Sequence, residues 1–301
     1  MNELLVKLNE VLEKSQEEAR YLRSENKELK DHIKHLEMAR KSMDMAQNNK
    51  PFEVPADFFT GCPFTPFSML HPMGITVEEQ IDGRHNLNGM SWSRIKYLCG
   101  RTGYSQFFSV GDTKDIILKN GEQITMRIIG IRHDTTHDGR KAALTWEMVD
   151  FMKDRHAMNK SCTNEGGWAS SEMRRYLNED VFALLPDEVQ DVICPVIKTT
   201  SCGGNKTGKV TTVDKLFLLS EHERYGRKFY SAGDEGRWYQ WYRREGVSYA
   251  KKYPNGDSGW GWERSPHGSD STYFCFVDSS GNASNYGGAS SSRGVAFGFC
   301  M

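Results

Sequence analysis

The sequence predicts an α+β fold in which one globular domain follows an N-terminal parallel coiled coil. Three observations favour this fold: a heptad seam in the first 45 residues, short β-rich runs separated by turn residues in the rest of the chain, and a few short helical segments among those runs. With 301 residues, of which 38% are hydrophobic and 26% charged, the chain is long enough for one large domain or two modest ones.

Residues 1–45 carry the pattern of a coiled coil. From Leu5 onward, seam residues recur at alternating steps of three and four, as the a and d positions of a heptad do. With Leu5 at a, Glu18 at g faces Arg23 at e of a parallel neighbour. Glu25 faces Lys30 in the same way, and both pairs are attractive. We therefore predict an oligomerisation helix with the seam residues Leu5, Leu8, Leu12, Leu22, Asn26, Leu29, Ile33 and Leu36.

The residues at the a positions indicate the number of strands in the coil. Asn26 and Ile33 at a, with leucine at most d positions, favour a parallel dimer, and a trimer is the alternative. Ser15 and Ala19 weaken the middle of the seam. A surface helix folded back on its own domain would need a wider apolar stripe than a and d alone. Self-association is therefore the expected role of this segment.

Residues 46–73 hold five of the nine prolines of the chain. Because proline cannot continue the interior of a helix, this segment is predicted to be a Pro-rich linker. The globular domain is then expected to span residues 74–301.

Several short elements are predicted inside that domain. Residues 116–118 and 123–131 are β-rich and flank Asn120-Gly121, which predicts a hairpin. A helix is expected over residues 172–177, with Ser170 or Ser171 as its N-cap. Two further elements are a helix over residues 187–192, after Pro186, and a buried strand over residues 215–219.

Charge and hydropathy argue against several classes of protein. A formal net charge of −1 at pH 7 leaves no basic footprint for a nucleic acid or an anionic membrane. No apolar run approaches the length of a transmembrane helix, and the acidic N-terminus does not fit a signal peptide. We therefore expect no nucleic-acid partner, no membrane insertion, and a location in the cytoplasm or on a particle assembled there.

The seven cysteines are scattered and include no C-x-x-C pair. This pattern favours neither a disulfide framework nor a zinc site. Free cysteine is among the most buried residue types. Buried, free thiols are therefore expected.

Three apparent motifs for phosphate binding, metal binding or catalysis are discarded. Residues 203–209 have the glycine and lysine spacing of a phosphate-binding loop, but Val210 stands where a magnesium-binding Ser or Thr belongs. Two His and two Asp within residues 133–138 lack a further ligand cluster, so a polar turn between strands is favoured over a metal site. No Gly-x-Ser-x-Gly elbow occurs. We expect no catalytic residue, no metal and no cofactor.

The aromatic segment 237–242 allows two interpretations. It could be a core strand with alternating inward rings, or it could stack on bases or sugars. Trp238 and Trp241 are expected in the core. Tyr239 and Tyr242 fit either role and are kept as candidate ligand-binding residues.

The C-terminal stretch has an unusual composition. Between Ser265 and Arg293 the chain carries nine Ser, four Gly, two Asn and two Tyr. Antibody binding loops use this composition for adaptable hydrogen bonds and aromatic contacts. Aromatic segments at 260–262 and 297–299 bracket the stretch. A binding face is therefore favoured over a catalytic pocket, with Trp260 as one aromatic contact.

An ordered series of motifs runs through the domain. It comprises Gly166-Gly167-Trp168, the segment 171–178, Leu185-Pro186, the segment 211–220, Trp262-Glu263-Arg264-Ser265-Pro266 and the segment 294–299. The series resembles a bacterial and phage domain family with a C-type-lectin-like fold, which is similar to the formylglycine-generating enzyme and to the variable proteins of diversity-generating retroelements. The resemblance covers residues 74–301. It implies a C-type-lectin-like (formylglycine-generating-enzyme-like) domain whose variable C-terminal region, about 260–301, displays a ligand-binding face.

The resemblance divides the terminal residues into two sets. In retroelement-diversified relatives, adenine-directed mutagenesis changes exposed positions while the scaffold stays fixed. The implied scaffold positions are Trp262, Arg264, Ser265, Pro266, Phe274, Phe276, Val277, Gly281, Gly294, Val295 and Phe299. The implied ligand-binding positions are Glu263, His267, Ser269, Ser271, Tyr273, Asp278, Asn282, Ser284, Asn285, Tyr286, Ser290, Ser291 and Ser292.

The coil and the resemblance together favour an oligomeric ligand-binding or receptor-binding display protein of a phage or bacterium. Its partners would be copies of itself and a variable surface protein or glycan. One face would bind modestly, and the coil would gather several faces to give avidity. The alternative is a formylglycine-generating-type oxidase or another enzyme on the same fold.

Overall fold

The computed structural model describes residues 80–81 and 84–301. The predicted coiled coil (1–45), with all eight of its seam residues, and the predicted linker (46–73) lie outside the described residues and stay predictions. Within the part that is described, no helix has the length and apolar character needed to span a membrane.

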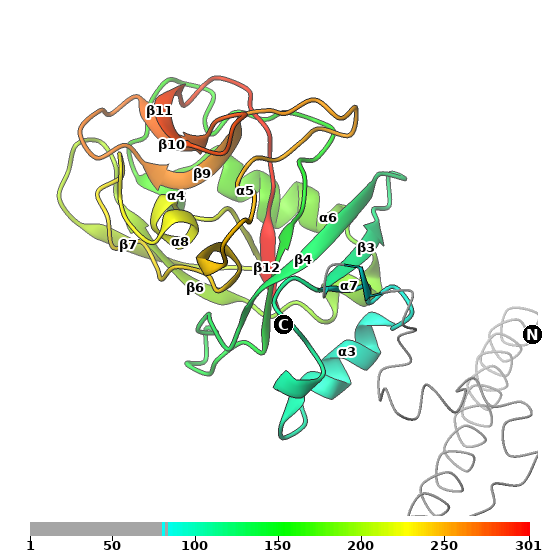
Figure 1. The fold of residues 1–301 in the computed structure, drawn as a ribbon. Coiled ribbons are helices and arrows are strands. Elements are labelled where there is room, and N and C mark those ends of the chain that lie inside the picture. The colour runs from blue at the N-terminus through cyan, green and yellow to red at the C-terminus, as the bar shows by residue number, and fades with distance from the viewer. Residues whose placement is uncertain (1–79, 82–83) are drawn as a thin grey trace, which may run out of the picture. The chain divides into compact units, whose positions relative to one another are not determined.

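Antiparallel sheets form the framework of the domain (Figure 1). The largest sheet has the strand order β3 (Thr113–Ile117), β4 (Gln123–Ile131), β5 (Leu144–Met148), β12 (Gly298–Cys300) and β8 (Leu216–Phe217). A second has the order β11 (Ala283–Gly288), β10 (Tyr273–Val277) and β9 (Gly261–Pro266). Two pairs complete the set: β6 (Val196–Ser201) with β7 (Lys209–Asp214), and β1 (Gln80–Ile81) with β2 (Arg84–His85).

The helices are short and lie between the strands in the chain. They are α3 (Trp92–Cys99), η2 (Tyr104–Gln106), α4 (Gly167–Ser170), α5 (Glu172–Tyr176), η3 (Leu177–Val181), α6 (Phe182–Leu184), α7 (Asp187–Gln190), α8 (Glu221–Tyr225) and η4 (Trp241–Arg243). With short helices and mostly antiparallel sheets in one domain, the α+β class is confirmed.

The locally encoded elements match the prediction. The turn between β3 and β4 places Gly121 at φ +87°, a conformation that glycine adopts without steric cost. The Ser171 hydroxyl accepts from the backbone N–H of Arg174 and caps α5. The helix after Pro186 is α7, and β8 lies within the predicted apolar run with both residues buried.

The expectation of a core strand over residues 237–242 is wrong. This segment is irregular and then enters the 3-10 helix η4. The Gln240 side chain takes the place of a strand partner, since its Oε1 accepts from the Ile131 backbone N–H and its Nε2 donates to the Ile131 carbonyl at 3.2 Å. Trp241 is buried as predicted, whereas Trp238 is only partly buried.

The last strand lies inside the largest sheet, between β5 and β8 (Figure 1). β12 pairs with β5 on one side and with β8 on the other. Its buried Phe299 packs on Trp146 and Trp92, with ring centroids 6.3 and 5.8 Å apart. The C-terminal segment is therefore part of the core and positions the loops that precede it.

The six cysteines that the structure describes are all free. Cys275 and Cys300 are buried, as predicted. Cys162 departs from the prediction because it is exposed, in the loop before α4, where its thiol donates to the Thr272 carbonyl at 3.6 Å.

Candidate ligand-binding face

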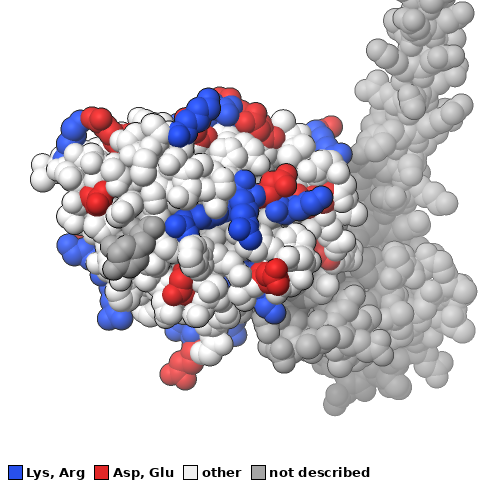
Figure 2. Space-filling view, turned by 90° about the horizontal axis from the view of Figure 1, so that it is seen from above, with Lys and Arg blue, Asp and Glu red and all other residues white. Residues whose placement is uncertain are grey.

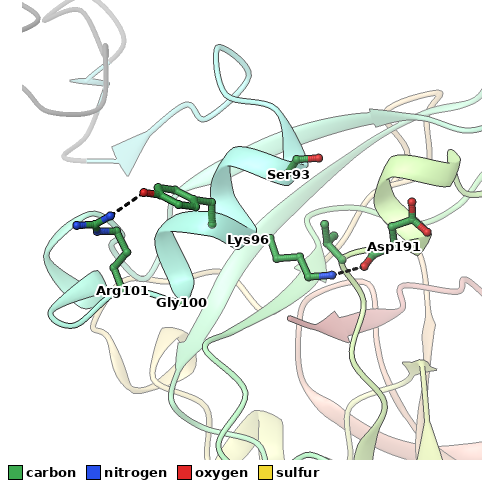
Figure 3. A pocket seen from close by; sticks show the side chains of 7 residues that line it. Ser93, Lys96, Gly100, Arg101 and Asp191 are labelled. Carbon is green, nitrogen blue, oxygen red and sulfur yellow. Dashed lines mark hydrogen bonds between the residues drawn. The ribbon is translucent and has the colours of Figure 1, made fainter. Parts of the chain in front are cut away.

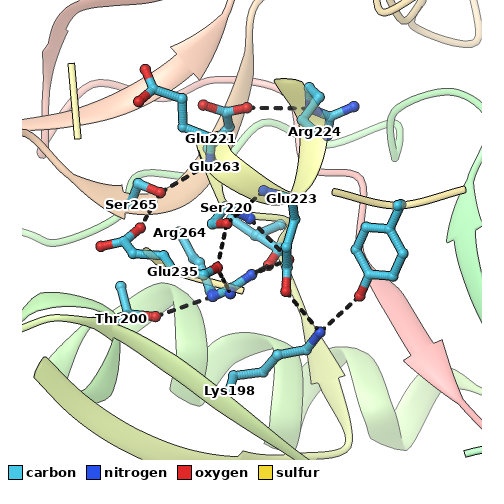
Figure 4. Close-up of polar contacts among 12 residues, drawn as sticks. Lys198, Thr200, Ser220, Glu221, Glu223, Arg224, Glu235, Glu263, Arg264 and Ser265 are labelled. Atoms are coloured by element: carbon cyan, nitrogen blue, oxygen red, sulfur yellow. Dashed lines mark hydrogen bonds and ion pairs between the residues drawn. The ribbon is translucent and has the colours of Figure 1, made fainter. Parts of the chain in front are cut away.

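A network of buried charges connects β9 to β6 and α8 (Figure 4), and Lys198 extends it to Asp134 in the turn after β4. Lys198 Nζ lies 2.6 Å from Asp134 Oδ1 and 3.2 Å from Glu223 Oε1. It also donates to the Tyr239 hydroxyl at 2.8 Å. Burial alone would raise the pKa of Asp134, but the Lys198 ammonium outweighs it and holds that pKa below its ordinary value. Each of these charges is compensated, which a buried charge requires.

All three guanidinium nitrogens of Arg264, on β9, donate hydrogen bonds to buried groups of the protein. Its Nη1 pairs with Glu223 and also donates to the Leu218 carbonyl at 3.0 Å. Its Nε donates to Thr200 Oγ1 at 3.1 Å, and its Nη2 to the Glu235 carbonyl at 2.8 Å. Figure 4 shows these donors fanning out from β9 toward three other segments. Arg264 therefore fixes the strand from which the C-terminal loops begin.

The carboxyl of Glu235 lies next to this guanidinium. It accepts from the Ser265 hydroxyl and from the Ser201 backbone N–H, the latter at 2.7 Å. Burial raises its pKa to about 7. The Ser265 hydroxyl in turn accepts from the Glu221 backbone N–H at 3.0 Å, so donor and acceptor are both satisfied.

A second buried group centres on Arg224 of α8. Its Nε donates to Glu263 Oε1 at 3.2 Å, and its Nη2 to Glu147 Oε1 at 2.9 Å. The Tyr242 hydroxyl donates to Glu147 Oε2 at 2.6 Å. Burial raises the pKa of Glu263 to about 8. This carboxyl is therefore largely protonated at neutral pH.

The structure contradicts the prediction that Tyr239, Tyr242 and Glu263 contact a ligand. All three side chains are buried and belong to the two networks. Glu263 is buried because other backbone segments pack against β9 and form hydrogen bonds with its neighbours. Trp262 N donates to the Gly294 carbonyl at 3.0 Å, and Arg264 N to the Leu219 carbonyl at 2.9 Å. All six residues of β9 are buried, so alternation along the strand brings none of them to solvent.

A hollow of about 470 Å³ opens beside this framework. It is lined by Arg155, Tyr253, Ser258, Gly259, Trp260, Ser279, Ser291, Ser292 and Arg293. Trp260 is 51% exposed. The Arg293 guanidinium carbon lies 4.9 Å from the Trp260 ring and 4.0 Å from the Phe276 ring. A cation close to aromatic faces is attracted by their quadrupoles. This attraction holds the Arg293 side chain against the rings of Trp260 and Phe276.

Four serine hydroxyls surround the exposed ring. Ser258, Ser279, Ser291 and Ser292 are exposed, and none of their hydroxyls bonds to another part of the chain that the structure describes. A serine hydroxyl can donate one hydrogen bond and accept two. The hollow therefore combines a flat aromatic surface with hydrogen-bonding groups available to a ligand.

The structure brings only some of the remaining predicted residues to this hollow. Trp260, Ser291 and Ser292 line it, and exposed Ser290 precedes them in the chain. Asp278 and exposed Asn282 form the β10–β11 turn, where Asp278 Oδ1 accepts from the Asn282 backbone N–H at 2.9 Å. Partly buried Ser284 lies on β11, as do Asn285 and Tyr286, whose side chains lie outside what the structure describes.

The other predicted residues form a separate group around the β9–β10 loop. His267 lies 6.3 Å from Tyr230 and 6.4 Å from Tyr273, measured between ring centroids. Ser269 is exposed and Ser271 is partly exposed in the same loop. Buried Asn164 holds this loop in place, since its Nδ2 donates to the carbonyls of Asp270 and Tyr273, both at 2.7 Å.

Sequence reasoning missed six residues of the hollow: Arg155, Tyr253, Ser258, Gly259, Ser279 and Arg293. Ser279 lies inside the Ser-rich stretch, so composition could have identified it. Arg155 and Tyr253 come from distant loops and carry no motif. The implied scaffold positions, by contrast, are all buried. Figure 2 views the domain from above, the side on which Figure 1 places β9 to β11, and shows charges of both signs dispersed over a largely uncharged surface.

A second hollow, of about 520 Å³, lies beside α3 (Figure 3). Its polar groups bond within the protein: Lys96 Nζ donates to the Asp191 carbonyl at 2.5 Å, and Arg101 Nη1 to the Tyr97 hydroxyl at 2.6 Å. This hollow therefore offers a ligand fewer hydrogen-bonding side chains than the hollow at Trp260 does.

The discarded motifs occupy turns. Residues 203–209 connect β6 to β7, and Lys206 pairs with Glu165 across the surface. Residues 133–138 form the predicted polar turn between β4 and β5, with Asp134 committed to Lys198. Within residues 80–81 and 84–301, no group of three or more His, Cys, Asp or Glu side chains is arranged to hold a metal ion.

Comparison with protein families adds one finding. A family model described as Domain of unknown function (DUF6273) matches residues 139–301, more than half of the chain. The chain belongs to the DUF6273 family. The DUF6273 segment contains every residue that lines the hollow at Trp260, and every charged residue of the two networks except Asp134. No curated protein and no solved structure matches the chain.

Proposed function

We propose that this protein is an oligomeric ligand-binding display protein, of the kind that diversity-generating retroelements vary in phages and bacteria. The observation that carries the proposal is the hollow at Trp260, where an exposed indole shares the lining with serine hydroxyls that form no hydrogen bond to the described part of the chain. Binding sites commonly combine an aromatic surface with a few polar groups that fix orientation. The ligand would be a protein or glycan on a bacterial surface.

The proposal includes a C-type-lectin-like fold for the globular domain. It is supported by the mixed, mostly antiparallel architecture and by the burial of all eleven implied scaffold positions. The same residues support a division between a fixed framework and substitutable loops. Substitutions in the loops would change the ligand without disturbing the networks under β9.

Self-association is the second part of the proposal. A parallel coiled coil over residues 1–45 would gather two or three heads, either in the cytoplasm or on a phage particle. Linked binding modules gain avidity without any new contact, so a shallow site with modest affinity would be sufficient. The hollow has this shallow, solvent-open character, since five of its nine lining residues are exposed serines and an exposed tryptophan.

The oxidase alternative has less support. The formylglycine-generating enzyme uses a close pair of cysteines, whereas the two buried cysteines here lie in different sheets, Cys275 on β10 and Cys300 on β12. Burial also raises the pKa of both thiols well above the ordinary value, which disfavours the reactive thiolate.

The test is a binding screen of the full chain against arrays of bacterial surface glycans and proteins. Trp260→Ala should lower the affinity for every ligand recovered by at least about tenfold, because it removes the aromatic surface. Tyr97→Ala, at the equally exposed ring beside α3, is the matched control and should bind like the wild type. If Trp260→Ala binds unchanged, the hollow is not the site.

Inspection of the surrounding genome gives an independent test of diversification. A neighbouring reverse transcriptase gene, with a near-repeat of the terminal coding sequence that differs at adenines, is expected. Repeats that differ at random bases, or only within the codons of buried residues such as Arg264, would contradict retroelement-driven display.

A further inference from the structure

Arg155 is an exposed arginine of the hollow that stacks on an aromatic ring. Its side chain is exposed, and its guanidinium carbon lies 4.4 Å from the centroid of the Tyr253 ring. No carboxylate among the described residues forms an ion pair with it, whereas Arg174, Arg224 and Arg264 each pair with one. An arginine stacked on a ring is already oriented, so it loses less conformational freedom when it binds an anion.

The charge of the hollow is positive. Its lining residues include two arginines, Arg155 and Arg293, and no Asp or Glu. Three acidic residues lie next to lining residues in the chain: Asp154, Asp257 and Asp278. Exposed Asp154 precedes Arg155 but forms no ion pair with it in the described part of the chain, and the other two are engaged in their own turns. Asp257 Oδ2 accepts from Asn255 Nδ2 at 2.7 Å, and Asp278 Oδ1 accepts from the Ser280 and Asn282 backbone N–H groups at 2.8 and 2.9 Å. Among the described residues, no ion pair therefore neutralises the charge of Arg155.

The remaining lining groups favour an anion that carries a sugar ring over other anions. The flat Trp260 ring offers a surface on which the apolar face of a pyranose can stack, and the four serine hydroxyls can bond to sugar hydroxyls. A volume of about 470 Å³ lies within the usual range for small-ligand sites. A nucleic acid is disfavoured, because the chain has a net charge of −1.

We propose that the hollow binds an acidic saccharide, whose sugar ring stacks on Trp260 and whose carboxylate pairs with Arg155. This inference rests on the proposed function, since it names the ligand class of the same site. Arg155 carries the preference for the acidic form, and Trp260 carries affinity for any saccharide.

The test compares acidic probes with neutral counterparts of the same shape. The probes are tetragalacturonate against its methyl ester, and sialyllactose against lactose, with affinities measured by calorimetry on the full chain. At least one acidic probe should bind about tenfold or more tightly than its neutral counterpart, as expected for a charge-assisted bidentate pair. The preference should weaken as salt is raised, because the site is open to solvent.

Variants separate the two roles. Arg155→Gln should abolish the preference for the acidic probe while leaving the affinity for the neutral one unchanged. Trp260→Ala should lower the affinity for both. The matched control is Arg227→Gln, which changes another exposed arginine stacked on an exposed ring, at 4.5 Å from Phe229 and outside the hollow. It should keep the wild-type preference.

Two outcomes would overturn the inference. If acidic and neutral probes bind equally and both depend on Trp260, the acidic-ligand inference fails while the display function stands. If no probe binds, the inference also fails, and the array screen with Trp260→Ala then decides the display function separately.

Discussion

Serine side chains behave in opposite ways beneath β9 and around the hollow at Trp260. Ser265 and Ser220 are buried, and each hydroxyl both donates and accepts a hydrogen bond. Ser291 and Ser292 are exposed, and their hydroxyls form no hydrogen bond within the described chain. The same residue type thus serves stability in one region and leaves hydrogen-bonding capacity for a ligand in the other. The stretch rich in serine is therefore not uniform in role.

The arginines of the two regions give the strongest test of this contrast. Arg264→Leu would remove one of the two cations that pair with buried Glu223 and the donor to the Glu235 carbonyl, and we expect it to lower the free energy of unfolding by about 3–5 kcal/mol. Arg155→Leu, at the exposed arginine of the hollow, should change it by less than about 0.5 kcal/mol. Urea unfolding of both variants at one pH measures the difference. Equal losses would mean that the framework and the hollow are not energetically distinct.

A second prediction uses pH to sharpen the contrast. Burial raises the pKa of Glu263 to about 8 from an ordinary 4.5, so between these values the folded chain retains a proton that the unfolded chain releases. Stability is therefore full below the lower value and falls as pH rises toward the upper one. Replacing this carboxyl in Glu263→Gln should remove a decline on the order of 3 kcal/mol over that window.

The measurement is the midpoint and free energy of urea unfolding from pH 5 to pH 9. Glu245→Gln, at an exposed position, is the control and should keep the wild-type slope. If Glu263→Gln also keeps the wild-type slope, the Glu263 carboxyl is charged in the folded protein.

The smallest expected effects come from single hydroxyls. Ser265→Ala leaves the Glu221 backbone N–H and one Glu235 oxygen without a partner, and should cost about 1–3 kcal/mol of unfolding free energy. Ser291→Ala should cost less than about 0.5 kcal/mol, while weakening binding of the saccharide found by the probe series. Thermal unfolding and calorimetry test the pair. A stability loss at Ser291 as large as at Ser265 would erase the contrast between the two regions.

Local patterns predicted much of the fold. The Asn120-Gly121 turn and the Ser171 cap depend on residues within a few positions of each other, so the sequence encodes them directly. The burial of Trp262 and Phe299 followed from the resemblance. The α+β class and these local elements can therefore be predicted from the amino-acid sequence alone.

The candidate site could be predicted less well from the sequence, because it depends on contacts between segments that are far apart in the chain. Glu263 is buried because α8 supplies Arg224 from about 40 residues away in the chain. Arg155 and Tyr253 meet at the hollow although about 100 residues separate them. No local pattern encodes such contacts. Of the residues that line the hollow, the sequence identified only Trp260, Ser291 and Ser292.

The position of β12 has a consequence for the order of folding. Strands β9, β10 and β11 follow one another and pair as neighbours, so their sheet can form from contacts that are short in sequence. Phe299 of β12, in contrast, pairs with Trp146 of β5, about 150 residues earlier. Closing so long a loop adds little to the equilibrium cost but slows the folding rate. We therefore expect β12 to pair with β5 late in folding, after β9, β10 and β11 have formed their sheet. The largest sheet is complete only after that step.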